Sequence, residues 1–80
     1  MRVTVHIERR PDIADPEGST IARSITDLGF EAVTSVRTGR SLHLDVDATD
    51  VEDVRRQVTE MCEKLLANPV IEDYTIEVHP

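Results

Sequence analysis

The sequence predicts an α+β fold of βαββαβ order, a ferredoxin-like sandwich in which two helices cover one face of an antiparallel sheet. Three observations support this prediction. Apolar and polar residues alternate in three short segments, and less regularly in a fourth, which is the period of a half-buried strand. Apolar residues recur every three or four positions in two longer segments, which is the period of a helix. Each helical segment lies between two strands. Because both helices are expected on one face of the sheet, its other face or its edges are left for oligomerisation.

The first strand and the first helix are predicted within residues 2–28. In RVTVHIER, the aliphatic residues Val3, Val5 and Ile7 alternate with polar residues. Asp15 can cap a helix, and Pro16 fits the first helical turn, where its missing N–H has no partner. An apolar stripe follows at Ile21, Ile25 and Leu28. Gly29 is then expected to end the helix.

The middle of the chain, EAVTSVRTGRSLHLDVD, predicts two strands joined by a tight turn at Thr38-Gly39. The later strand alternates regularly, with Leu42, Leu44 and Val46 on one face. The earlier strand is less regular, because Val33 and Val36 have opposite parity. This irregularity indicates a bulge or an early twist.

The second helix and the last strand are predicted over residues 49–78. Thr49 and Glu52 fit a capping box, and the helix is expected to run to about Ala67. Its apolar stripe consists of Val51, Val54, Val58, Met61 and Leu65, widened by Cys62 and Leu66. Asn68 and Pro69 end the helix. The strand that follows places Val70, Tyr74, Ile76 and Val78 on one face.

The composition predicts one small domain, residues 1–80, that associates with other subunits. A chain of this length buries only about 60% of the surface that its unfolded form exposes, and its single cysteine excludes an intramolecular disulfide. We therefore expect a dimer or a tetramer. The net charge of −7 and the presence of only two aromatic residues argue against nucleic acid as a partner. No signal peptide or membrane span is recognisable, so a cytoplasmic location is expected.

The candidate reactive side chains each have a simpler interpretation. Cys62 lies on or beside the helix stripe, which favours a buried thiol over a nucleophile. His6 and His43 occupy outward strand positions, where a metal could bind with Glu8 or Asp45, but a polar surface or a subunit interface is favoured. The clustered acidic residues lack the spacing of a calcium loop. With no catalytic triad or phosphate-binding loop, we expect no catalytic, cofactor or metal site in this chain.

Two short segments are candidates for contact with a partner. The segment Arg37-Thr38-Gly39-Arg40 concentrates two cations in an acidic chain, which fits either a solvated turn or contact with an anionic partner surface or a phosphate group. Glu72 and Asp73 interrupt an apolar strand. Such charges either protect a sheet edge from unwanted pairing or contact a partner.

Four stretches of the sequence carry a family resemblance. They are Asp15-Pro16-Glu17-Gly18, Leu28-Gly29-Phe30, Val36-Arg37-Thr38-Gly39-Arg40, and the very specific Leu65-Leu66-Ala67-Asn68-Pro69-Val70-Ile71-Glu72-Asp73-Tyr74. In order and spacing they resemble the PurS family, the small subunit of phosphoribosylformylglycinamidine (FGAM) synthase. The resemblance covers nearly the whole chain. The departures are Glu17, Arg40 and Ile13-Ala14, where the family commonly has glutamine, lysine and Val-Leu.

The resemblance implies a small non-catalytic subunit of a ligase complex in de novo purine biosynthesis. It would bridge PurL, an ATP-dependent synthetase, and PurQ, a glutaminase, and support ammonia transfer. The complex converts formylglycinamide ribonucleotide to formylglycinamidine ribonucleotide with glutamine and ATP. ATP and Mg²⁺ would then be used by the complex, with no cofactor held by this chain. The expected interface with another copy or the larger subunits comprises Arg37, Gly39, Arg40, Asn68, Pro69, Glu72, Asp73 and Tyr74.

A second hypothesis is an ACT-like regulatory module, in which paired βαββαβ units bind a small molecule between them. A third, an RNA-binding sheet, requires exposed aromatic residues and a basic face. The sequence offers neither of these, so we set the RNA-binding hypothesis aside.

Overall fold

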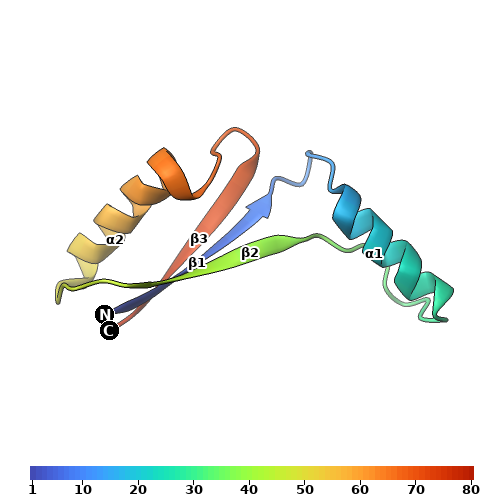
Figure 1. Ribbon diagram of the computed structural model, residues 1–80, viewed down its shortest axis with the longest axis horizontal. Coiled ribbons are helices and arrows are strands. Elements are labelled where there is room, and N and C mark those ends of the chain that lie inside the picture. The colour runs from blue at the N-terminus through green and yellow to red at the C-terminus, as the bar shows by residue number, and fades with distance from the viewer.

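A computed structural model describes residues 1–80. The strands are β1 (Arg2–Arg9), β2 (Gly39–Asp45) and β3 (Glu72–His79), and the helices are α1 (Pro16–Asp27) and α2 (Val51–Met61), with α2 continuing into the π-helical turn η1 (Cys62–Leu66) (Figure 1). Neither helix combines the length and the apolar character that crossing a membrane requires.

The three strands form an antiparallel sheet with β1 at its centre, in the order β2-β1-β3. Val5 of β1 lies opposite Leu42 of β2 and Ile76 of β3, so the alternating aliphatic residues of all three strands share one face. Helix α2 covers this face (Figure 1). The buried apolar core consists of Val3, Val5, Ile7, Val54, Val58, Cys62 and Ala67. The predicted α+β class, its antiparallel sheet and the alternation along β1 and β2 are therefore confirmed.

The end of α2 departs from the predicted stripe. The backbone N–H of Ala67 donates to the carbonyl of Cys62 at 3.1 Å, which is the i→i+5 bond of a π turn. The wider turn accommodates one extra residue, so Cys62 and Ala67 face the core, whereas the side chain of Leu65 is 81% exposed. The placement of Leu65 on the stripe was wrong for this reason. The N-cap also lies one residue later than predicted, since Asp50, rather than Thr49, accepts from the N–H of Glu52.

Residues 30–38 differ from the predicted strand. They form no ladder with another strand, and Gly39 begins β2 instead of closing a turn. The opposite parity of Val33 and Val36 gives this segment no continuous apolar face to lay on the sheet. The segment instead returns beside α1 (Figure 1), and the carbonyl of Val36 lies against Gly18 in the first turn of the helix.

Helix α1 does not cover the sheet, although the sequence predicted two helices on one face. It projects past the end of the strands (Figure 1), and the apolar side chains of residues 16–36, a segment that we call the arm, take no part in the core. Leu28 and Phe30 in the arm are 75% and 63% exposed. The radius of gyration of 16.0 Å exceeds the roughly 12 Å expected of a compact chain of this length. Only α2 therefore covers the sheet within one chain.

We expect Gly18→Ala to lower the free energy of unfolding by roughly 1–3 kcal/mol, because an added methyl group has no room. A Cβ at this position would lie 2.2 Å from the carbonyl oxygen of Val36, which is backbone and cannot rotate away. Urea unfolding measures the effect. The control is Ser19→Ala at the adjacent exposed position, which should change stability by no more than about 0.5 kcal/mol. Equal stability of the Gly18→Ala and Ser19→Ala proteins would contradict this account of the close contact.

Candidate functional site

The residues singled out by the sequence lie at one end of the sheet, where β1 ends and β2 and β3 begin (Figure 1). We call this end, residues 9–15, 37–40 and 68–73, the apex. The antiparallel order explains the meeting of segments that are far apart in the chain, because the last residue of β1 pairs with the first residue of β3. The structure therefore brings together the two segments predicted to contact a partner.

Arg37 holds the loop that follows β1. Its Nη2 atom donates to the carbonyls of Arg10 and Ile13, each at 2.8 Å, and to that of Arg9 at 3.4 Å. The carbonyls of Arg10 and Ile13 belong to the irregular backbone that follows β1, and that of Arg9 belongs to the last residue of the strand. Since the guanidinium satisfies them, one of the two cations predicted at a hairpin tip has a structural role in this chain.

Arg40 and Glu72 form the second tie. Two guanidinium nitrogens of Arg40 donate to the Glu72 carboxylate at 2.7 and 3.3 Å, and one of them also donates to the carbonyl of Leu66 at 2.9 Å. Glu72 accepts in addition from the backbone N–H of Asn68 at 2.7 Å. The hydrogen bonds from Arg40 and then Asn68 lower the pKa of Glu72, and the bond to Glu72 raises the pKa of Arg40. This network fixes the junction between η1 and β3.

The other predicted interface residues divide between surface and interior. Asp73 is exposed and lies 3.5 Å from the guanidinium of Arg10, while Asn68 accepts from the N–H of Val70 through its own side chain. Tyr74 packs against the core, and burial followed by the charge of Glu63 raises its pKa. Whether any of these residues contacts a partner stays a prediction.

Asp15 joins the arm to the apex. Its carboxylate accepts from the N–H of Gly18 at 2.9 Å, as predicted for an N-cap, and also from the N–H of Thr38 at 2.6 Å and the hydroxyl of Thr38. The bond from the Thr38 backbone, and then that from Gly18, lower the pKa of Asp15 to about 2. The sequence indicated the cap but gave no sign of the contact with Thr38, which closes a loop of 23 residues.

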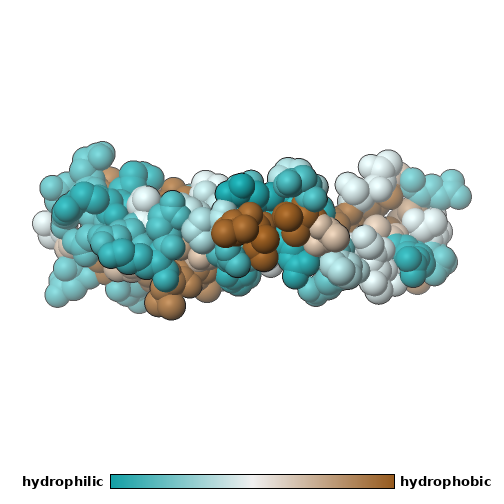
Figure 2. All heavy atoms as spheres, turned by 90° about the horizontal axis from the view of Figure 1, so that it is seen from above, coloured by the Kyte–Doolittle hydropathy of each residue, from teal (hydrophilic) through white to brown (hydrophobic).

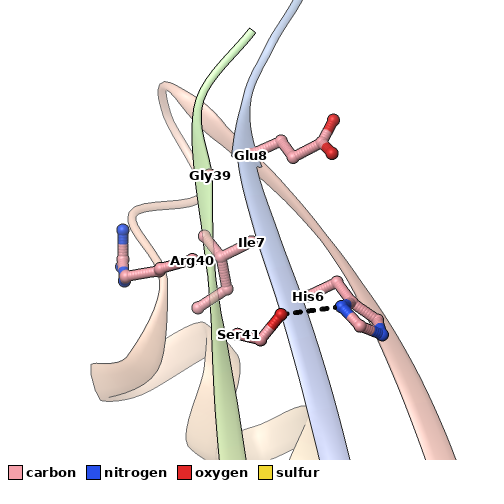
Figure 3. Close-up of a pocket in the computed structure, with 6 residues that line it drawn as sticks. All are labelled: His6, Ile7, Glu8, Gly39, Arg40 and Ser41. Carbon is pink, nitrogen blue, oxygen red and sulfur yellow. Dashed lines mark hydrogen bonds between the residues drawn. The ribbon is translucent and has the colours of Figure 1, made fainter. Parts of the chain in front are cut away.

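A shallow hollow of about 250 Å³ lies along β1 and β2 beside the apex (Figure 3). The Nδ1 atom of His6 and the hydroxyl of Ser41 form a hydrogen bond of 2.9 Å on one side, while Arg40 points to the other side. The polar groups around this hollow do not converge on one point. Such an arrangement gives no position at which a substrate atom would meet a nucleophile and a base.

The two histidines considered as metal ligands face different neighbours. His6 contacts Ser41 and lies 3.3 Å from Glu77, whereas His43 lies 3.3 Å from the hydroxyl of Thr4. The two residues are therefore two positions apart along the ladder rather than opposite one another. Cys62 is fully buried in the core, and desolvation raises its pKa, which keeps the thiol protonated. Its interpretation as a buried thiol is confirmed.

Comparison with known proteins identifies the family. The family model described as "PurS: Phosphoribosylformylglycinamidine (FGAM) synthase" matches residues 2–80. The chain belongs to the PurS family. The PurS subunit of Archaeoglobus fulgidus is 43% identical over 95% of each chain. The PurS-family resemblance of the four sequence motifs is thereby confirmed.

Solved structures of PurS proteins have the same fold. The Methanocaldococcus jannaschii PurS structure is 42% identical and superposes with a TM-score of 0.88, covering 98% of this chain and 94% of that one. A chain of the structure entitled PurLQS, from Thermotoga maritima, is 34% identical with a TM-score of 0.87, covering 95% of this chain and 93% of that one. The PurS fold and the membership of this chain among FGAM synthase subunits follow from these matches.

We expect the stability that Asp15 contributes to be lost in acid. The carboxyl has its ordinary pKa of 3.8 in the unfolded chain and about 2 in the folded one. Its contribution is therefore present in full above pH 3.8 and is lost as the pH falls through about 2, below which the carboxyl is protonated in both states. The melting temperature between pH 6 and pH 2 measures this loss. Asp15→Asn should start lower at pH 6, having lost an acceptor for Thr38, and should fall less steeply than the wild type.

The control for the acid titration is Asp12→Asn, which removes an exposed carboxylate from the same loop. Its melting temperature should follow the wild-type curve across the whole range. An equally steep fall for Asp15→Asn and the wild type would show that the contacts of Asp15 do not produce the acid sensitivity.

Proposed function

We propose that this chain is the non-catalytic PurS subunit that bridges the PurL synthetase and the PurQ glutaminase of FGAM synthase. In this role it supports ammonia transfer during the glutamine- and ATP-dependent conversion of formylglycinamide ribonucleotide to formylglycinamidine ribonucleotide. The relative of Thermotoga maritima that is 34% identical to this chain belongs to a structure entitled PurLQS. ATP and Mg²⁺ are bound by the larger subunits in this proposal, and the complex works in the cytoplasm.

The observation that carries the proposal is the uncovered arm. Helix α1 is amphipathic, yet its apolar side is only partly covered within the chain, and Leu28 and Phe30 are mostly exposed. Exposed apolar surface on a projecting element is typical of a subunit contact. A second copy of the chain is the simplest partner for the arm. Only α2 covers the sheet of each copy, and β2 and β3 are unpaired edge strands, so each copy offers both a partly covered sheet face and open edges. We therefore propose that the chain self-associates through the arm.

An ACT-like regulatory module is not favoured. The match to the PurS family covers residues 2–80, and the two hollows that reach β2 are rimmed by charged side chains such as Glu8 and Arg40. A small-molecule site is ordinarily concave and mostly apolar. A thermal-shift screen against amino acids and nucleotides tests this alternative directly.

Reconstitution tests the bridging role. The cognate PurL and PurQ proteins should synthesise formylglycinamidine ribonucleotide from glutamine only when this chain is present, whereas synthesis from ammonium should depend on it much less. The physical reason is that a bridging subunit couples two active sites, while ammonium supplied from solution bypasses that coupling. Equal dependence of both reactions, or of neither, would contradict the bridging role.

Self-association through the arm predicts that Leu28→Asp combined with Phe30→Asp shifts the protein toward monomers. Burying two charges in an apolar interface is costly, whereas both positions are exposed in the single chain, so the fold should survive. Sedimentation velocity gives the oligomeric state, and circular dichroism checks the fold. Thr26→Asp is the control, since 100° per residue places it on the opposite side of α1 near the same end. A double variant that remains associated would refute the role of the arm.

A further inference from the structure

The largest hollow of the chain, about 540 Å³, is not used by the proposed function. It lies at the bend between the end of the strands and α1 (Figure 1). Three segments that are distant in the sequence line it, namely Arg9 at the end of β1, Glu17 and Ile21 in α1, and residues 36–40. Because these segments surround the hollow, it offers a site for a small group rather than a flat contact surface.

The lining of this hollow is cationic, although the chain is acidic. The face seen in Figure 2 is largely hydrophilic apart from a group of apolar spheres in its middle, and the whole chain has 16 Asp and Glu residues against nine Lys and Arg residues. The hollow has the reverse balance, with Arg9, Arg37 and Arg40 against the single carboxylate of Glu17. It is the only one of the three hollows in which cations outnumber carboxylates.

Arg9 and Arg37 form no ion pair within the chain. Glu72 lies near Arg9, but its ion pair is with Arg40, at 2.7 Å. Asp15 lies near Arg37, but its carboxylate accepts from two backbone N–H groups and a hydroxyl. Two positive charges on the lining are therefore left without a paired carboxylate.

Both unpaired guanidiniums are held in place and keep free donors. Arg9 donates through Nη1 to the carbonyl of Ala14 at 2.9 Å, and Arg37 donates to its loop carbonyls through Nη2 alone. A guanidinium has five N–H donors, so Nε and the other terminal nitrogen of each side chain form no hydrogen bond within the chain. Guanidiniums bind phosphate groups through paired, charge-assisted hydrogen bonds, and these free N–H groups can form them.

We propose that this hollow binds the phosphate group of a small molecule through Arg9 and Arg37. A charged lining does not suit the mostly apolar ligands of ordinary small-molecule sites, but it suits an anion with two negative charges. The site belongs to the single chain, so it does not depend on the bridging role.

A titration of the full chain with inorganic phosphate tests the site. Two-dimensional amide NMR at neutral pH and constant ionic strength, with chloride as the matched anion, should show saturable shifts within residues 36–40. Arg9→Gln should raise the dissociation constant about tenfold, because hydrogen bonds to a charged group are lost. Arg23→Gln is the control, an exposed arginine of α1 that does not line the hollow. Its dissociation constant should stay within about twofold of the wild type, since distant charges are screened by salt.

Ribose 5-phosphate and ribose, titrated in the same way, distinguish the sources of the phosphate group. Tighter binding of ribose 5-phosphate than of inorganic phosphate would identify a phosphorylated metabolite as the ligand, and equal affinity would identify free phosphate. Both results support the site. Binding of ribose with the affinity of ribose 5-phosphate would contradict it, because the sugar and not the phosphate would then be recognised.

Two other results would overturn the inference and leave the bridging role intact. One is the absence of saturable shifts within residues 36–40. The other is equal weakening by Arg9→Gln and Arg23→Gln, which would indicate general attraction between charges. Circular dichroism checks the fold of each variant. If Arg9→Gln does not fold, Arg9→Lys decides, because it keeps the charge and loses the planar pair of donors. Wild-type affinity of Arg9→Lys would then refute the site.

Discussion

The structure depends on hydrogen bonds that arginine side chains donate to backbone carbonyls at the apex. A three-stranded sheet with one helix on it leaves long irregular segments, whose carbonyls have no ladder partner. Arg37 satisfies carbonyls of the loop after β1, Arg40 reaches the end of η1, and Arg10 reaches the turn before β3. A guanidinium has five donors in a fixed plane, so one side chain can serve several acceptors. In this chain, arginine side chains therefore satisfy backbone carbonyls that a fourth strand would pair in a larger sheet.

Arg37 and Arg40, the two cations near the start of β2, both form hydrogen bonds within the chain. Substituting Arg37 or Arg40 removes ties within the chain, so a loss of assembly in such variants would not by itself locate an interface. Val70 and Leu65 have no such role, because their side chains are mostly exposed. The exposed aliphatic residues are thus better probes of subunit contacts in this protein than the charged residues of the sequence motifs.

Local patterns predicted the elements more accurately than the way they pack. The alternation in β1 and β2, the cap at Asp15 and the stop at Asn68-Pro69 are visible in the sequence because each depends on a few neighbouring residues. The π turn was missed, since the sequence around Cys62 fits an α-helical period equally well and the choice depends on packing against the sheet. The position of α1 was missed as well. Its apolar stripe signals that the helix is covered, without indicating whether its own sheet or another chain covers it.

The candidate site was predicted in part. Arg37, Arg40, Glu72 and Asn68 all lie at the apex, but the sequence could not show that their polar groups mostly form hydrogen bonds within the chain. The contact between Asp15 and Thr38 spans 23 residues and follows no local pattern. The family motifs contain these residues, but their hydrogen bonds follow from the three-dimensional arrangement of the apex.

The arm is attached to the rest of the molecule where Thr38 donates to the Asp15 carboxylate, so a small rotation at this point moves the far end of the arm by a larger distance. A helix of 12 residues is about 18 Å long, and here it is attached to the body of the molecule at one end only. A rotation of α1 by about 10° about its attached end therefore displaces its far end by roughly 3 Å, given a rise of about 1.5 Å per residue. The hydrogen bonds of Asp15 and the close contact between Gly18 and the carbonyl of Val36 thus set the angle at which Leu28 and Phe30 are presented, far from either contact.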